Sequence, residues 1–435
     1  MATTELKRTI SSAGSQTKWG ASAWVKLSGA GTLNDTQAVY CSSKSDTTAN
    51  LRGIMITGDD VIQVAFYDGG YSFRVETTRE LRDPSAFYHL CIECDTSQST
   101  AEDRIKIWVN GVKETSFSQT SYPAHNGTYN FFGTDITQLV GSLREGSTIC
   151  NPCIISHLHV TDGYCYPASS YGETDTTTGE WKIKTSPSVS YGTNGFFVLK
   201  DDAALTDRSG QGNDLTLGSG TLTKTEDNPS NVFATLDPLN VPTSTAPTFS
   251  NGNTKVVTST GAQFGGSSNL GAKTGKYYFE IKFVAESTSN MGNISLSSTS
   301  NARESARQNV HSNQLSATYP NLCYEYDGNV YKDSGSSQGS FGTYSTGDII
   351  IIAMDLDNQK AYFGKNGTWG NSGDPTSGST GTGAVTLSAN SDFWHLALGD
   401  RNSSATATYE VNFGNGYFGT TAISSEGPNA SGIGK

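Results

Sequence analysis

Two Cys-x-x-Cys pairs have the residue types and the spacing that could bind a metal ion. They are Cys91 with Cys94 and Cys150 with Cys153. A structural zinc site needs four tetrahedral nitrogen or sulfur ligands. Cys91 and Cys94 fall in a strand-like stretch, where residues three apart point to opposite faces, so they cannot share one metal without a bulge. Cys150-Asn-Pro-Cys153 is turn-like and could bring its two sulfurs together.

Two histidines, His157 and His159, follow the second cysteine pair. Residues two apart on a strand share one face, so both rings could meet one ligand. Cys150, Cys153, His157 and His159 are therefore weak metal candidates, and the two cysteines are also a candidate disulfide. The count of seven cysteines is odd and gives no dense disulfide framework, which favours free thiols. We expect no bound metal.

The carboxylates do not have the pattern that sugar hydrolysis needs. Glycosidases place two carboxylates about 5–10 Å apart across the sugar. Glu93 and Asp95 lie two apart on one predicted strand. No G-x-S-x-G, H-E-x-x-H or phosphate-loop motif is present, so we expect no enzyme activity. Two acidic pairs could bind calcium through loop oxygens, and solvated turns are the simpler account of both: Asp59-Asp60 and Asp201-Asp202.

Aromatic side chains next to Asn, Asp or His could stack on sugars and hydrogen-bond to them. One such group lies in a loop rich in Gly, Asn and His, and a second flanks the Asp-Gly-Asn turn at residues 327–329. Aromatic residues of this kind more often pack across neighbouring strands. The candidate glycan contacts are Tyr122, Tyr129, Phe131, Tyr324, Tyr326 and Tyr331.

The composition predicts an all-β protein. Its 435 residues include 48 Gly, and charged residues make up only 16%, which is below the usual quarter. Short strand-like segments follow each other about every ten residues with turn residues between them, as is typical of β-sandwiches. The nearly continuous apolar run 349–354 predicts a strand buried on both faces. Asn366-Gly367 predicts a hairpin turn after the next strand.

The net charge and the N-terminal sequence limit the expected partners and the expected location of the protein. The formal net charge of −12 disfavours a nucleic-acid partner and favours solubility. No apolar run approaches the roughly 20 residues that cross a membrane. The N-terminal residues MATTELKRTISSAG lack the apolar core of a signal peptide. We therefore expect synthesis in a cytoplasm, no classical export and no membrane insertion.

Three motifs occur together in the C-terminal half. Residues 347–369 read GDIIIIAMDLDNQKAYFGKNGTW, residues 275–281 read GKYYFEI and residues 393–397 read FWHLA. As a set they resemble SPRY domains, which are concanavalin-A-like β-sandwiches. Tyr277 stands where that family usually has Trp, and F-x-P-A is commoner than FWHLA. The aromatic-rich strand that usually closes such domains is missing after residue 421.

The N-terminal half carries a different set of motifs. Residues 19–26 read WGASAWVK, residues 88–96 read YHLCIECDT and residues 105–111 read IKIWVNG. They resemble laminin-G-like, concanavalin-A-like jelly rolls. Asp95 matches a turn position of that laminin-G-like pattern, which disfavours it as a catalytic partner of Glu93. The further motifs YGETD at 171–175 and DRSGQGND at 207–214 limit the resemblance to a smaller class of proteins. Together the two halves resemble structural proteins of tailed phages of the marine or cyanophage type, in which a laminin-G-like module precedes a SPRY-like module.

The predicted organisation is therefore two concanavalin-A-like β-sandwiches in tandem. We predict a leader or anchor at 1–18, a laminin-G-like sandwich with a packed extension at 19–225 and a linker at 226–248. A SPRY-like sandwich follows at 249–421, and a Gly/Ser-rich tail at 422–435.

The resemblance implies a virion surface protein, either a tail fibre or a capsid decoration fibre, that presents lectin-like modules to host glycans. Its expected partners are other virion proteins, a host cell-surface glycan and further copies of itself, with a trimer favoured. Two alternatives stay open. One is a carbohydrate-binding or polysaccharide-degrading protein outside a virion, and the other is a virion part that binds no glycan.

Overall fold

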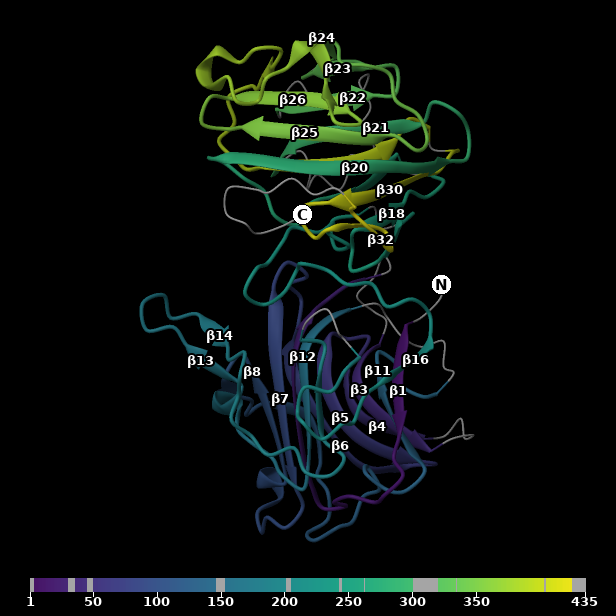
Figure 1. Cartoon of the computed structure of the whole chain (residues 1–435), viewed down its shortest axis with the longest axis vertical. Helices are drawn as coiled ribbons and strands as arrows, with labels where there is room; N and C mark the ends of the chain where they lie inside the picture. The colour runs from purple at the N-terminus through teal and green to yellow at the C-terminus, as the bar shows by residue number, and fades with distance from the viewer. Residues whose placement is uncertain are drawn as a thin grey trace. The chain divides into compact units, whose positions relative to one another are not determined.

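The computed structural model describes residues 4–29, 36–44, 50–145, 153–200, 205–241, 245–261, 263–299, 320–333, 335–402 and 404–424. They form two compact units, with the division near residues 224–233 (Figure 1). Among these residues the structure contains no helix long and apolar enough to cross a lipid bilayer.

The first unit is a sandwich of two antiparallel sheets. The larger sheet has the strand order β10-β6-β5-β4-β3-β11-β1-β16. Its strands are β1 (Glu5–Thr9), β3 (Gln37–Lys44), β4 (Asn50–Ile56), β5 (Val61–Asp68), β6 (Tyr71–Glu80), β10 (Phe117–Ser121), β11 (Ile136–Val140) and β16 (Thr216–Ser219). The smaller sheet has the order β15-β12-β2-β7-β8-β9. Its strands are β2 (Lys18–Lys26), β7 (Phe87–Asp95), β8 (Ile105–Val109), β9 (Val112–Lys113), β12 (Ile154–Asp162) and β15 (Phe196–Val198).

Alternating side chains of both sheets form one core. Tyr40 and Val64 of the larger sheet pack in the same buried cluster as Val25 and Ile92 of the smaller sheet. Such a shared core is what the strand periodicity predicts for a sandwich. Three-residue 3-10 helices lie at η1 (Ala101–Asp103) and η2 (Ala168–Ser170), and β13 (Gly172–Thr174) pairs with β14 (Trp181–Ile183) as a separate hairpin.

The segment predicted as a leader contributes a strand to this sandwich. β1 pairs with β11 on one side and with β16 on the other. Leu6 is 3% exposed and belongs to the core. The strand is short and its other residues are polar, so its alternation was too brief to identify it from sequence.

A segment at 164–195, here called the strap, covers the outer face of the smaller sheet. Ala168 and Tyr171 of the strap form a buried cluster with Cys91 of β7. Trp181 of the strap packs on the same cluster, and its Nε1 donates a hydrogen bond to His89 Nδ1 at 3.0 Å. Outward side chains such as those of His89 and Cys91 are therefore buried, although they face away from the main core.

The second unit is also a sandwich of two sheets. The larger sheet has the order β17-β18-β30-β20-β25-β26-β27, with β28 also paired to β26. Its strands are β17 (Thr248–Ser250), β18 (Lys255–Val257), β20 (Lys276–Glu286), β25 (Ile349–Asp355), β26 (Lys360–Lys365), β27 (Thr368–Trp369), β28 (Val385–Thr386) and β30 (Ala407–Asn412). The smaller sheet has the order β19-β29-β21-β22-β23-β24. Its strands are β19 (Phe264–Ser267), β21 (Gly292–Ser298), β22 (Asn321–Glu325), β23 (Asn329–Lys332), β24 (Ser336–Ser340) and β29 (Trp394–Asp400).

The apolar run 349–354 lies at the centre of the larger sheet, between β20 and β26 (Figure 1). Ile350 and Ile352 point into the core, whereas Ile351 is 3% exposed on the other face. The predicted strand buried on both faces is thus confirmed. Asn366 and Gly367 have φ angles of 50° and 78°, which is the backbone that the predicted turn requires.

The remaining short elements are η4 (Gly370–Ser372), η5 (Gly378–Thr380) and the paired strands β31 (Tyr417–Phe418) and β32 (Thr421–Ala422). Leu236 is fully buried in the second core, so part of the predicted linker packs as part of this sandwich. Most of the predicted tail, residues 425–435, lies outside the described residues.

Candidate binding site

The three aromatic residues predicted as sugar contacts in the first sandwich all pack against its core. Phe131 is 1% exposed, and its ring lies 4.5 Å from that of Trp19, which leaves it no face for a sugar, contrary to the prediction. Tyr129 packs edge-to-face on Phe73 at 5.0 Å. Tyr122 is half-buried against the same core. These residues stabilise the loop and do not form a common site.

The three candidates of the second sandwich have separate places. Tyr324 is fully buried, and its hydroxyl donates to the carbonyl of Gly342, so it too is a core residue and not a sugar contact. Tyr331 pairs with Cys323 and therefore lies on the opposite face of the sheet from Tyr324. Tyr326 follows β22 at a turn and lines a hollow at the edge of the sandwich.

The metal candidates do not converge in the part of the chain that the structure describes. Cys150 lies outside the described residues, and Cys153 is half-buried. His157 Nδ1 lies 2.7 Å from the hydroxyl of the preceding serine, whereas His159 Nδ1 lies 2.8 Å from the hydroxyl of Tyr191. A bulge in β12 between residues 156 and 159 breaks the regular spacing that would place both rings on one face. Among the described residues there is no group of three or more His, Cys, Asp or Glu side chains that could hold a metal ion.

The calcium candidates are equally separate. Asp201 and Asp202 lie outside the described residues. Asp59 is exposed on a turn, and Asp60 is 9% exposed with a φ of 60°. Burial raises the pKa of Asp60 to about 6, so the carboxyl is still mostly ionised at neutral pH.

Cys91 and Cys94 lie on opposite faces of β7, as the sequence predicts. The thiol of Cys91 lies under the strap, 3.4 Å from the carbonyl of Tyr166. Cys94 belongs to the core between the two sheets. The two sulfurs cannot bind one metal in this arrangement.

A buried serine–histidine pair in the first sandwich has the spacing of a catalytic pair but not its proton arrangement. Ser22 Oγ lies 2.8 Å from His89 Nε2, and Trp181 Nε1 lies 3.0 Å from His89 Nδ1. An indole N–H can only donate, so Nδ1 accepts, and the neutral ring carries its proton on Nε2. His89 therefore donates to Ser22 and cannot remove its proton.

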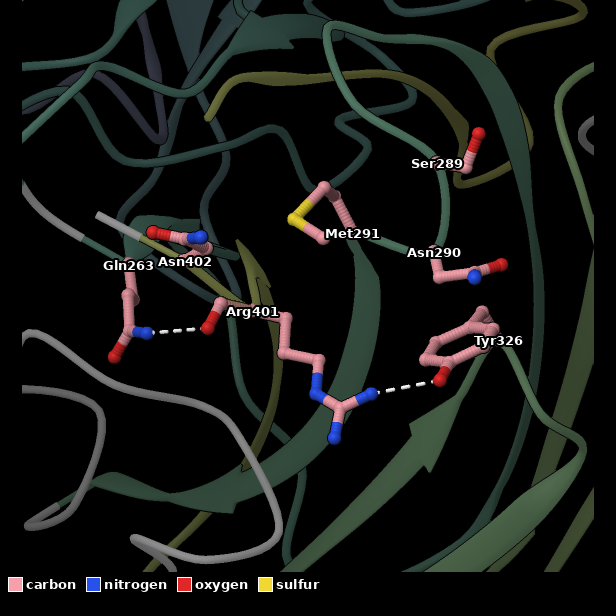
Figure 2. Close-up of a pocket in the computed structure, with 7 residues that line it drawn as sticks. All are labelled: Gln263, Ser289, Asn290, Met291, Tyr326, Arg401 and Asn402. Atoms are coloured by element: carbon pink, nitrogen blue, oxygen red, sulfur yellow. Dashed lines mark hydrogen bonds between the residues drawn. The ribbon is translucent and has the colours of Figure 1, made fainter. Parts of the chain in front are cut away.

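The best candidate for a binding site is a hollow of about 350 Å³ in the second sandwich, here called the loop pocket. Three connections and the residue just before β19 surround it: the β20–β21 loop, the β22–β23 turn and the β29–β30 loop (Figure 2). Its volume is within the range of small-molecule sites. The residues that line it are Gln263, Ser289, Asn290, Met291, Tyr326, Arg401 and Asn402.

Arg401 and Tyr326 are the central pair of the loop pocket. One Nη of Arg401 donates to the Tyr326 hydroxyl at 2.7 Å, and the guanidinium carbon lies 5.4 Å from the Tyr326 ring centroid (Figure 2). A guanidinium carries five N–H donors in a planar fork, which suits carboxylates and phosphates. Among the described lining residues there is one cation and no carboxylate.

Backbone contacts hold the pocket residues in place. Gln263 Nε2 donates to the carbonyl of Arg401, and the Arg401 N–H donates to the carbonyl of Met291 at 3.0 Å. Asp400 is fully buried beneath this loop, and one of its oxygens accepts the Asn402 N–H at 3.1 Å. Burial raises the pKa of Asp400 to about 6.

Tyr326 was the one residue of this pocket that the sequence pointed to. Gln263, Asn290 and the pair Arg401-Asn402 lie in three separate polar segments with no motif of their own. Arg401 and Tyr326 are 75 residues apart, and only the pairing of β29, β21 and β22 brings them together. The sequence signal that could have pointed to Arg401 was an arginine in a polar loop of a chain that has few charged residues.

Comparisons with known proteins give partial likenesses. No family model matches the chain. The sequence is 31% identical over 99 residues to Ran-binding protein 9 and 32% identical over 99 residues to Ran-binding protein 10, both from Danio rerio. Each alignment covers 22% of this chain, and the chain spans about 15% of the length of these relatives.

Solved structures similar to the chain include two kinds of β-sandwich. The SPRY domain of human HERC1 is 18% identical with a TM-score of 0.30, over 40% of this chain and 96% of that one. The mouse laminin alpha1 chain domains LG4-5 are 10% identical with a TM-score of 0.30, over 98% of this chain and 92% of that one.

Proposed function

We propose that this chain is a non-catalytic adhesion protein on the surface of a phage virion and that its loop pocket contacts a host-surface glycan. The observation that carries the proposal is the composition of the pocket. Arg401, Tyr326 and several amide side chains line it, and no carboxylate is among the described lining residues. Pockets with few convergent polar groups and an aromatic ring are typical ligand sites.

The pocket chemistry favours a sugar that carries a carboxylate. The guanidinium of Arg401 can bind a carboxylate through two parallel N–H donors. The amides of Gln263, Asn290 and Asn402 can donate to and accept from sugar hydroxyls. The ring of Tyr326 offers an apolar surface beside these groups.

The virion context rests on the sequence motifs of the two halves and their order. In this proposal the chain is made in a host cytoplasm, assembles as a homo-oligomer with a trimer favoured, and contacts other virion proteins. It inserts into no membrane and binds no nucleic acid, in keeping with the net charge of −12. Both a tail fibre and a capsid decoration fibre fit this role.

The full chain is expected to bind carboxylated glycans on an array of bacterial surface glycans. Replacing Arg401→Gln should weaken this binding about 10- to 100-fold, because a charge-assisted hydrogen bond contributes about 1.5–3 kcal/mol. Lys332→Gln is the matched control. It removes the same charge from the same sandwich, and Lys332 Nζ donates to the exposed carbonyl of Thr386 at 2.7 Å, away from the residues that line the loop pocket. A blank array at high protein concentration would contradict glycan adhesion and favour a purely structural part.

Gold-labelled antibody against residues 250–420 is expected to decorate purified phage particles in electron micrographs. Label at the tail indicates a tail fibre, and label over the head indicates a capsid decoration fibre. Particles without label, from a preparation in which the antibody detects the chain in the infected lysate, would show that the protein is not displayed on the virion.

A further inference from the structure

The outer face of the larger sheet in the second sandwich carries a second cluster of aromatic and polar side chains. Tyr278 of β20 is 52% exposed and lies at the end of a sheet row, because β30 pairs with β20 only from Glu280 onward. Trp369 of β27 is half-buried, and its ring centroid lies 6.2 Å from that of Tyr278 with an interplanar angle of 76°. The two rings therefore form a corner that opens away from the core.

Residues of β25 and β26 form the floor between the two rings. β20, β25 and β26 are adjacent strands (Figure 1), and Tyr278 pairs with Ala353 of the middle strand. Trp369 pairs with Gly364, where a Cβ atom would clash with the backbone carbonyl of Thr368. The same face also carries Ile351, which pairs with Gly364, and Tyr362, which pairs with Ala353. Both side chains are buried, so the two rings stand on a closed and mainly apolar floor.

Polar side chains lie beside the corner formed by the Tyr278 and Trp369 rings. Glu280 lies two residues after Tyr278 on the same face, and it accepts the Tyr278 hydroxyl at 2.7 Å. Asn412 Nδ2 donates to the second oxygen of Glu280 at 3.3 Å. An ionised carboxylate has about four acceptor positions, so Glu280 can accept further hydroxyl donors beyond these two. The hydrogen bond also fixes the orientation of the Tyr278 ring.

We propose that this cluster, the Tyr278 platform (Tyr278, Glu280, Ala353, Trp369 and Asn412), binds a neutral saccharide. The C–H face of a sugar ring is attracted to the negative face of an aromatic ring. Glu280 would accept hydroxyl groups at the rim of the bound sugar. This site goes beyond the loop pocket proposed above.

The charge of the platform determines which class of saccharide it can bind. The carboxylate of Glu280 disfavours an acidic sugar, whereas the loop pocket has an arginine.

The platform and the loop pocket are separate sites. Tyr278 is the third residue of β20, and Asn290 of the loop pocket follows the other end of that strand. The eleven residues of β20 span about 35 Å. A ligand on the platform should therefore not respond to a change at Arg401.

The test is calorimetric titration of the full chain with cellohexaose, maltohexaose, xylohexaose and mannohexaose. At least one of them is expected to bind, and Tyr278→Ala should weaken that binding about tenfold or more, as for an aromatic hot spot. Tyr278→Phe keeps the ring and should weaken it less than Tyr278→Ala. Tyr277→Ala is the matched control, since Tyr277 is 46% exposed but pairs with Met354 and lies on the opposite face. It should leave the affinity within about twofold of the wild type.

The proposal is overturned if none of the four hexasaccharides binds at about 10 mM, a concentration that detects even millimolar affinity. It is also overturned if Tyr277→Ala weakens binding as much as Tyr278→Ala. Arg401→Gln separates this proposal from the glycan adhesion of the loop pocket. That variant should retain hexasaccharide binding while it loses carboxylated glycans, so either site can fail without the other.

Discussion

The first sandwich loses stability as the pH falls below about 6.5, because two histidines under the strap are buried in their neutral form. His89 is fully buried, and burial lowers its pKa to about 3. Burial also lowers the pKa of His159 well below its usual range. In the unfolded chain both rings take up a proton near pH 6.5. The unfolded state therefore binds more protons, and acid favours it.

The size of this effect follows from proton linkage. The stability is fully present above about pH 6.5 and decreases by about 1.4 kcal/mol per pH unit for each buried histidine until its folded pKa is reached. For His89 that window extends down to about pH 3. The groups that face His89 are Ser22, Trp24 and Trp181, and none of them carries a charge that would offset its protonation.

Calorimetric melting of the full chain between pH 7.5 and 5 measures this effect. His89→Gln removes one titrating ring, so the melting temperature of the first sandwich should fall less steeply with pH than in the wild type. An identical slope in His89→Gln and the wild type would show that His89 is not the acid-sensitive group.

Replacing Tyr409→Phe is expected to cost the second sandwich about 2–4 kcal/mol, because it leaves two buried backbone groups without a partner. Tyr409 belongs to β30 of the larger sheet and is fully buried. Its hydroxyl accepts the Asn293 N–H at 2.9 Å and donates to the carbonyl of Gly399. Those residues belong to β21 and β29 of the smaller sheet, so one phenol joins both sheets directly behind the loop pocket.

Chemical denaturation of the full chain tests this prediction, with Tyr362→Phe as the control. Tyr362 is fully buried, but its hydroxyl lies 3.2 Å from Ser377 Oγ, a half-buried side-chain hydroxyl that can turn to another partner. Its loss leaves no backbone group behind and should cost less than about 1 kcal/mol. Tyr409→Phe should also weaken glycan binding several-fold, because the loops that carry Asn290 and Arg401 lose their common support. Equal stabilities of the two variants would contradict this role of Tyr409.

The fold was predictable where a strand or turn has a clear local sequence pattern. The apolar run at 349–354 and the Asn366-Gly367 turn are local signals, and both are where the sequence places them. β1 was missed because a five-residue strand with one buried leucine shows too little alternation. Its pairing with β16, more than 200 residues away, is a property of the whole fold.

The site was less predictable because it depends on contacts that are distant in sequence. Tyr324 and Phe131 are aromatic and flanked by polar residues, but their neighbours in space make them core residues. Tyr326 lies only two residues after Tyr324. Because β22 ends at Glu325, Tyr326 leaves the sheet and its side chain lines the loop pocket. Gln263 contacts Arg401 across 138 residues, and no local pattern encodes that contact.

A structure of the full chain with the tightest carboxylated glycan from the array tests the central claim most directly. The account predicts the glycan carboxylate within hydrogen-bond distance of the Arg401 guanidinium, with a sugar ring beside Tyr326 and hydroxyl contacts to Asn290 or Asn402. A glycan bound elsewhere on the chain, with the loop pocket empty, would contradict the account.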